Sequence, residues 1–117
     1  MIHLPFPPST NTYWRHIMVK GSPRTVLSAK GRIYRKQVHH VLAEDYRGLE
    51  RLTGPLRVTM ELHPPDKRRR DLDNYSKAVW DALEGIVYED DSQIREAHFY
   101  WRDPCESGRV IIHLEEL

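Results

Sequence analysis

Two short acidic segments are the part of the sequence best suited to chemistry. Asp71 and Asp73 flank Leu72, and residues two apart in an extended or turn-like backbone point to the same side. Asp90 and Asp91 follow after one predicted helix, so a helix out and a turn back would bring this second pair beside the first. Converging carboxylates repel one another unless a cation neutralises them. Mg²⁺ is the natural candidate, because it binds a few carboxylates together with water and phosphate.

Basic residues accompany these acids. Lys77 follows Asp73 by one helical turn, so the two would share a helix face. A lysine beside a Mg²⁺ site can stabilise the charge that develops on a scissile phosphate. Arg68, Arg69 and Arg70 directly precede the acids and suit charge-assisted contacts to a DNA backbone.

Each of these residues also has an ordinary structural explanation. Asp71 or Asp73 could cap a helix, because acids favour its first turn. Lys77 could form a surface ion pair with Asp73 or Asp81, and Asp81 itself is expected to be a helix-surface charge. The segment 90–91 could be an ordinary turn. We favour the chemical interpretation, because the structural explanations require several coincidences in one short stretch.

These segments resemble the RusA family of Holliday junction resolvases, the crossover junction endodeoxyribonucleases. The specific part of the resemblance is carried by Arg68 to Asn74, Lys77, Asp81 to Leu83 and Glu89 to Ile94. Weaker matches at Pro7 to Arg15 and Ser28 to Arg35 extend it over nearly the whole chain.

The resemblance implies a site and a reaction. Asp71, Asp73 and Asp91 would hold Mg²⁺ (or Mn²⁺), with Asp90 as an additional candidate, and Lys77 would be the essential lysine. A homodimer would make paired nicks across four-way junction DNA and leave 5′-phosphate and 3′-hydroxyl ends. Many members of the family are encoded by phages or prophages. Tyr75 departs from the family pattern, in which we expect an aliphatic residue, so it would pack in the core or meet a partner.

The N-terminal third supplies further candidate DNA contacts. Residues 1–40 contain seven Lys or Arg and no Asp or Glu, and such charge asymmetry is a hint of nucleic-acid contact. Trp14 beside Arg15 suits stacking on unpaired bases, and Asn11 and Lys30 are the other candidates. Trp14 could instead pin a loop to the core, and Asn11 could fix that loop's turn.

Two other functions stay open from the sequence. One is a Mg²⁺ nuclease for flaps or other branched DNA, which cleavage assays on different substrates would separate from a junction resolvase. The other is a non-catalytic nucleic-acid-binding regulator, which would bind DNA without metal-dependent turnover. Zinc is disfavoured, because adjacent histidines at 39 and 40 cannot easily share one metal and no cysteine or histidine spacing supports it.

The composition indicates one globular domain over residues 1–117. The chain is 39% hydrophobic and 30% charged, with a net charge of +1. One cysteine cannot form an internal disulfide. No apolar stretch is long enough for a membrane span, and the N-terminus lacks the pattern of a secretory signal, so we expect no membrane association and a cytoplasmic protein.

The elements that would position these residues form an α+β domain in the order β-(β)-α-β-α-β-β. Two main helices would pack on one mixed or antiparallel sheet. Alternating apolar residues predict a strand over 56–63. We expect a polar, aromatic loop over 9–17 and a turn at 21–23. The remaining predicted elements are strands at 1–6, 25–27, 94–102 and 109–114, a helix from the N-cap Ser28 to about Glu44, and a second helix beginning at 71–74.

Overall fold

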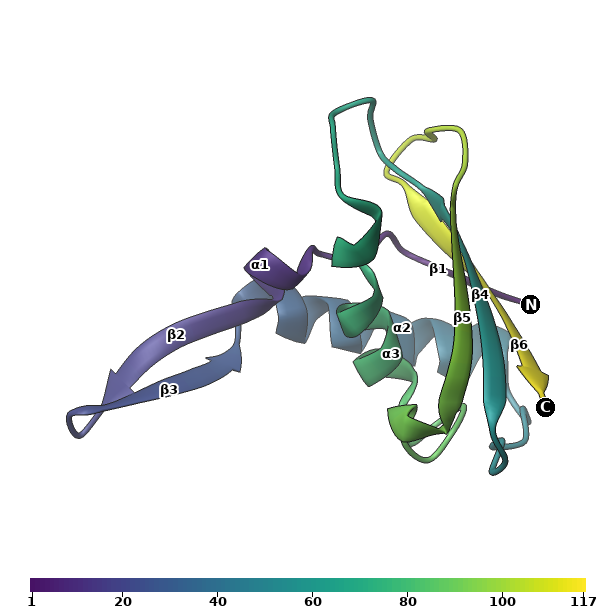
Figure 1. Cartoon of the computed structure of the whole chain (residues 1–117), viewed down its shortest axis with the longest axis horizontal. Coiled ribbons are helices and arrows are strands. Elements are labelled where there is room, and N and C mark those ends of the chain that lie inside the picture. Colours follow the sequence, from purple (N-terminus) through teal and green to yellow (C-terminus); the bar gives the residue numbers. More distant parts are fainter.

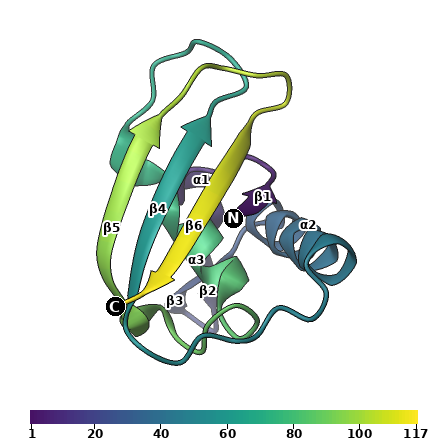
Figure 2. The same ribbon diagram turned by 90° about the vertical axis from the view of Figure 1, so that its right-hand side faces the viewer.

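A four-stranded sheet with two helices on one face forms the body of the molecule (Figures 1 and 2). The computed structural model describes all residues 1–117. The sheet consists of β1 (Ile2–Leu4), β4 (Leu56–His63), β5 (Ile94–Trp101) and β6 (Arg109–Glu116). The helices are α2 (Ala29–Asp45) and α3 (Ser76–Leu83). The predicted α+β class with two main helices is confirmed.

The sheet is mixed, with the strand order β1-β6-β4-β5. Strand β4 pairs in parallel with β5 and antiparallel with β6, and α3 forms part of the crossover from β4 to β5. The predicted alternation of β4 is confirmed, because its residues are alternately buried and half-buried along the strand. Strand β5 is an edge strand with no neighbour on its outer side.

Packing of the helices on the sheet creates one hydrophobic core. Val38 and Leu42 of α2 and Val79 of α3 meet Val58 and Met60 of β4 in this cluster. Ser28 caps α2 as predicted, and its Oγ accepts a hydrogen bond from the Gly31 amide at 3.1 Å. None of the helices combines the length and the apolar character that crossing a membrane requires.

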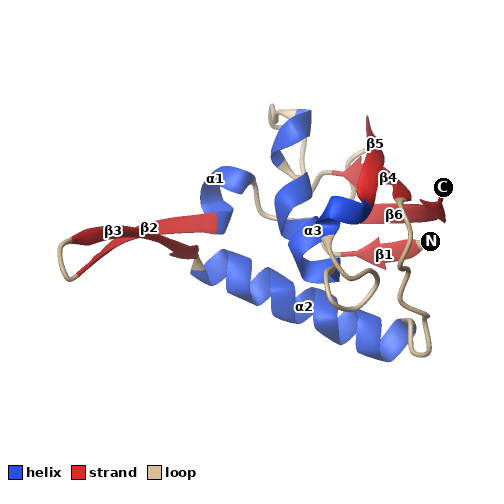
Figure 3. Ribbon diagram, turned by 60° about the horizontal axis from the view of Figure 1, so that its bottom comes forward, coloured by secondary structure: helices blue, strands red, loops and turns tan.

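A β-hairpin, which we call the arm, projects from this body (Figures 1 and 3). It consists of β2 (Trp14–Val19) and β3 (Ser22–Leu27), and the short helix α1 (Thr10–Tyr13) precedes it. Lys20 and Gly21 form its two-residue loop, and both have the positive φ that such hairpin loops favour. The predicted loop over 9–17 is therefore wrong, and the turn predicted at 21–23 begins one residue earlier, at Lys20. The predicted strand at 25–27 is part of β3. The arm has no buried face, so no one-sided apolar alternation marks its strands.

The segment before α3 differs in detail from the prediction. A 3-10 turn, η1 (Leu72–Asn74), comes first, and α3 begins only at Ser76. Tyr75 between them is buried, with ring centroids 5.2 Å from Phe6 and 5.9 Å from Trp101. The residue that departs from the family pattern therefore packs in the core.

Candidate active site

Three carboxylates gather where the chain returns from α3 to the sheet. Glu84 ends α3, and Asp90 and Asp91 lie at the 3-10 turn η2 (Asp91–Gln93), which leads directly into β5. One oxygen of each carboxylate lies within 4.8 Å of the others. Asp91 and Asp90 were predicted from the sequence for a metal site, whereas Glu84 was not.

Local hydrogen bonds fix this cluster. The Asp91 amide donates to Glu84 Oε1 at 3.0 Å. Asp90 caps η2 by accepting from the Ser92 amide, while its own amide donates to Gln93 Oε1 at 2.9 Å. Gln93 in turn donates to the carbonyl of Leu52 at 3.0 Å and thereby anchors the turn to the body. The acids are therefore held by a folded turn and not by a free loop.

The proximity of the acids is visible in their pKa values. The hydrogen bond from the Asp91 amide lowers the pKa of Glu84. The hydrogen bond with Asp90, desolvation and the neighbouring negative charges together raise it by more, so the net shift of the Glu84 pKa is upward. The pKa of Asp90 is lowered, chiefly by the hydrogen bonds from Ser92 and Glu84. Carboxylates this close together offer hard oxygen donors, which are the ligands of Mg²⁺ and Mn²⁺.

Asp71 and Asp73 do not join this cluster within one chain. Both are exposed. Asp71 directly precedes η1 and Asp73 lies within it, at the opposite end of α3 from Glu84. An eight-residue helix is about 12 Å long, and Figure 1 shows the chain passing down α3 before it turns into β5. The expectation that one helix and a turn would bring the two acidic segments together in one chain is therefore wrong.

Lys77 lies on α3 and pairs with Asp81. The distance from Lys77 Nζ to Asp81 Oδ1 is 3.0 Å, and the lysine side chain is 40% exposed. Asp81 is not the exposed surface charge that we expected, because only 13% of its side chain is accessible. Its second oxygen, Oδ2, accepts a hydrogen bond from the Tyr13 hydroxyl at 2.9 Å.

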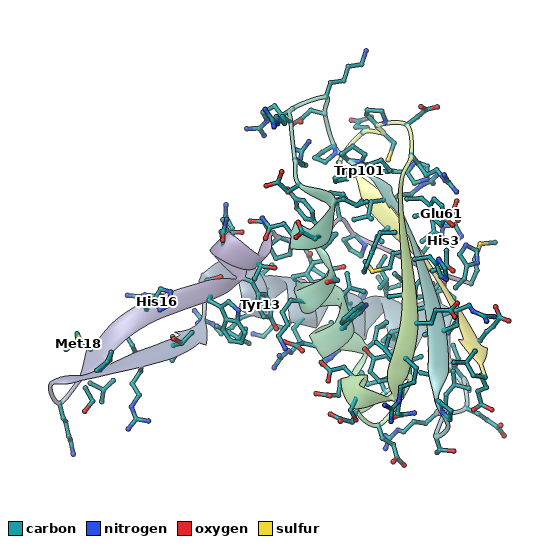
Figure 4. All side chains as sticks on the ribbon, viewed as in Figure 1. His3, Tyr13, His16, Met18, Glu61 and Trp101 are labelled. Carbon is teal, nitrogen blue, oxygen red and sulfur yellow. The ribbon has the colours of Figure 1, made fainter.

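Tyr13 lies where the arm joins the body (Figure 4). Its side chain is buried, and its hydroxyl accepts from Arg35 Nη2 at 3.2 Å while it donates to Asp81. Burial, followed by the hydrogen bond and the charge of Asp81, raises the pKa of Tyr13 to about 12. The hydroxyl is therefore protonated at neutral pH and remains a donor.

A basic groove lies between α2 and the segment that precedes η1. Lys30, Arg68, Arg69 and Arg70 line a cavity of about 380 Å³ there. Asp66 pairs with two of these arginines, at 3.1 Å from Arg68 and 2.8 Å from Arg70. The structure thus brings four predicted DNA contacts together around one groove.

The arginines of this groove differ in their freedom. The Arg70 side chain is 12% exposed, and its guanidinium lies 5.8 Å from the Phe6 ring centroid, so it secures the loop as well as lining the groove. The Arg68 side chain is 82% exposed despite its pairing with Asp66. Arg69 and Lys30 are exposed and form no ion pair. The latter two are the freest cations for a phosphate ligand.

The other N-terminal candidates divide between the core and the arm. Trp14 is half-buried and packs edge-to-face on Tyr13, with ring centroids 4.9 Å apart, so it pins the root of the arm. Asn11 and Arg15 are exposed on α1 and β2. Figure 4 shows Met18 farther out, toward the end of the arm.

Comparison with known proteins finds relatives over nearly the whole chain. Residues 5–115 match the family model described as Endodeoxyribonuclease RusA. The crossover junction endodeoxyribonuclease RusA of Escherichia coli (strain K12) is 36% identical over 117 residues, which cover 99% of this chain and 93% of the relative. The proteins of the same name from Shigella sonnei (strain Ss046) and Enterobacteria phage 82 show the same identity and coverage.

Proposed function

Because the chain belongs to the RusA endodeoxyribonuclease family, it is an endonuclease, and we propose that it resolves four-way DNA junctions by metal-dependent paired nicking during recombination and repair. The carboxylate cluster of Glu84, Asp90 and Asp91 is the observation that carries the metal-dependent part of the proposal. The junction as substrate is supported by the names of the relatives, which are crossover junction endodeoxyribonucleases. Membership of an endonuclease family decides against the non-catalytic regulator.

The donor set fits Mg²⁺, or Mn²⁺ in its place. Asp71, Asp73 and Asp91 are the proposed ligands, with Asp90 and Glu84 as neighbours that complete or orient the set. All offer hard carboxylate oxygens, and no cysteine or histidine is part of the cluster. When bound, the cation would activate the attacking water and stabilise the charge on the phosphate oxygens.

We propose a homodimer that unites the two acidic segments. Tyr75, next to η1, packs on Trp101 at one end of β5, whereas Asp91 lies before the other end. The outer edge of β5 is free to pair with a second copy. If the β5 strands of two copies pair antiparallel, the start of one β5 lies beside the end of the other. Asp91, just before the start of β5, would then lie beside the end of the partner's β5, and the partner's η1 lies at that end. Asp91 would thus approach Asp71 of the partner subunit and Asp73 of the partner subunit.

Such a dimer fits the proposed reaction. A two-fold axis produces two equal sites, and a four-way junction has approximate two-fold symmetry, so two nicks can be made on symmetric strands. The products would carry 5′-phosphate and 3′-hydroxyl ends. The substrate DNA of a cell or an infecting phage lies in the cytoplasm, which is the proposed location.

The DNA backbone would lie along the basic surface. Lys30 and Arg69 at the groove would contact phosphates, with Arg68 and Arg70 beside them, and Arg15 would extend the contact onto the arm. Asn11 on α1 and Trp14 at the start of β2 precede Arg15 closely in the chain. Lys77, half-exposed on α3, would stabilise charge on the scissile phosphate.

Cleavage assays test the proposed function directly. The protein is incubated with a synthetic four-way junction, a flap and a linear duplex of the same sequence, each in Mg²⁺ and in excess EDTA. We expect paired, symmetric nicks in the junction with Mg²⁺ only. Efficient cutting in EDTA would disprove the metal requirement, and faster cutting of the flap would assign a different branched substrate.

A further inference from the structure

Asp81 holds two donors that come from distant parts of the chain. Lys77 Nζ lies 3.0 Å from Oδ1, and the Tyr13 hydroxyl lies 2.9 Å from Oδ2. We infer that Asp81 is the positioning residue for Lys77, and that Tyr13 fixes its carboxylate by tying it to the root of the arm. This inference rests on the proposed catalytic role of Lys77.

The Asp81 carboxylate cannot rotate freely to follow its lysine. Only 13% of the side chain is exposed, and the Tyr13 hydroxyl is held from its other side by Arg35. Tyr13 is itself immobilised, because α1 packs closely on α2. Gly31 of α2 faces the Tyr13 carbonyl oxygen, and a Cβ atom at Gly31 would lie only 2.9 Å from that oxygen. The Ser28 amide also donates to that carbonyl at 2.9 Å. The carboxylate is therefore anchored by the body of the protein.

An anchored carboxylate changes what the ion pair can do. An exposed lysine at i, i+4 from an acid gains little stability from the pair, and its flexible four-carbon chain stays mobile. Lys77 instead meets a fixed acceptor, so its ammonium is confined to one position. An ammonium has three N–H donors, and only one is needed by Asp81. The other two remain for phosphate oxygens, and holding them in place lowers the entropic cost of the reaction.

The inference is tested by a double-mutant cycle of Asp81→Asn and Lys77→Ala. Single-turnover cleavage of a four-way junction in Mg²⁺ is measured at saturating protein, with junction affinity and melting temperature for each variant. We expect Asp81→Asn to slow cleavage about 10-fold while junction affinity stays unchanged. In the Lys77→Ala background the same change should have no further effect, because Asp81 acts only through the lysine.

Two additional variants separate positioning from folding. Tyr13→Phe keeps the Asp81 carboxylate and removes its anchor together with the hydrogen bond from Arg35. It should therefore slow cleavage less than Asp81→Asn does and should also lose its effect without Lys77. Asp45→Asn at the end of α2 is a matched removal of an exposed helical acid and should cut at the wild-type rate.

The results distinguish this inference from the proposed function. If Asp81→Asn slows cleavage by the same factor with and without Lys77, its role is structural and the inference is wrong. The inference also fails if Lys77→Ala is impaired but Asp81→Asn cuts normally. If Lys77→Ala itself cuts at the wild-type rate, the catalytic role proposed for Lys77 fails first, and the positioning role fails with it.

Discussion

Replacing an aspartate by asparagine at position 71, 73 or 91 removes the charge that would hold the proposed divalent cation but keeps the shape of the side chain. We expect each of Asp71→Asn, Asp73→Asn and Asp91→Asn to cut at least about 100-fold more slowly, because transition-state charge is no longer stabilised. Junction binding should survive, since losing a carboxylate weakens the repulsion of DNA phosphates. Gel shifts and cleavage on one junction measure both effects. If a folded variant cuts at the wild-type rate, the substituted residue is not part of the site.

Glu84 offers a test of the cluster that needs no DNA. Its raised pKa means that its carboxyl binds a proton more tightly in the folded than in the unfolded chain. The stability that it contributes is therefore present at low pH and is lost as the pH rises through the raised value. In EDTA, the melting temperature of Glu84→Gln relative to wild type should increase from about pH 4 to about pH 8.

Divalent cations provide the control for this test. Mg²⁺ or Mn²⁺ should raise the melting temperature of the wild-type protein at neutral pH, because a cation that binds only the folded state stabilises it. The rise should be much smaller in Glu84→Gln. Equal rises in both proteins would mean that Glu84 is not part of the cation site.

Residue type and spacing singled out the acids of η1 and η2 as candidates, but not the residues that lie beside them in the fold. Glu84 has the appearance of an ordinary acid at a helix end, and only the fold shows that it faces Asp90 and Asp91. Asp81 was misjudged for a similar reason. Its donor Tyr13 lies 68 residues away in the sequence, so no local pattern could indicate that the carboxylate is enclosed.

The arm makes a prediction at the level of secondary structure. It carries Arg15, which pairs with Val26, and Arg24, which pairs with Ile17, and it contains no acid. We expect Arg15→Ala/Arg24→Ala to flatten the salt dependence of junction affinity by up to about 2 in the slope of log K against log[salt], one for each lost phosphate contact. Binding is measured in EDTA to prevent cleavage. Because an isolated two-stranded hairpin is only marginally stable, circular dichroism should accompany the measurement.

A charge-matched control makes the arm experiment decisive. Arg47→Ala/Arg51→Ala removes the same charge near the far end of α2, away from the groove, and should leave the salt slope unchanged. Equal slopes for the two double variants would show that the arm makes no DNA contact. If the arm variant instead sediments as a monomer while the wild type is a dimer, the arm serves the subunit interface.

Sequence patterns predicted the elements with one buried face more completely than the two strands of the arm, which have none. The strand at 56–63 was predicted with its correct bounds, because every second side chain points into the core. The cap at Ser28 gave the start of α2. The first strand of the arm left no such signal, since it has no buried residue. The fold class followed from the buried elements alone.

At the level of the whole molecule, the sequence could not show whether one chain holds a complete site. The spacing of the acidic segments suggested convergence within the chain, but α3 keeps its two ends apart by its own length. The free edge of β5 suggests how pairing with a second copy would bring the acidic segments of two chains together. Whether sites are shared between subunits can be tested separately from whether the protein cuts junctions.

Subunit mixing provides that test. In a dimer of one Asp71→Asn and one Asp91→Asn subunit with shared sites, one site contains both substitutions and the other contains neither. After random reassortment half of the dimers are mixed, and each has one intact site of two, so about one quarter of the wild-type sites should be active. The products should be single rather than paired nicks.

The matched control is a mixture of Asp71→Asn with Asp73→Asn. These positions belong to the same acidic segment, so every shared site in the mixed dimer carries one defect and no activity should return. Analytical ultracentrifugation with a size-tagged subunit verifies that mixed dimers form in both experiments. Recovery with Asp91→Asn but not with Asp73→Asn is the expected result. If mixed dimers form and neither mixture cuts, each site lies within one chain; if the protein is monomeric both free and on the junction, the homodimer itself is disproved.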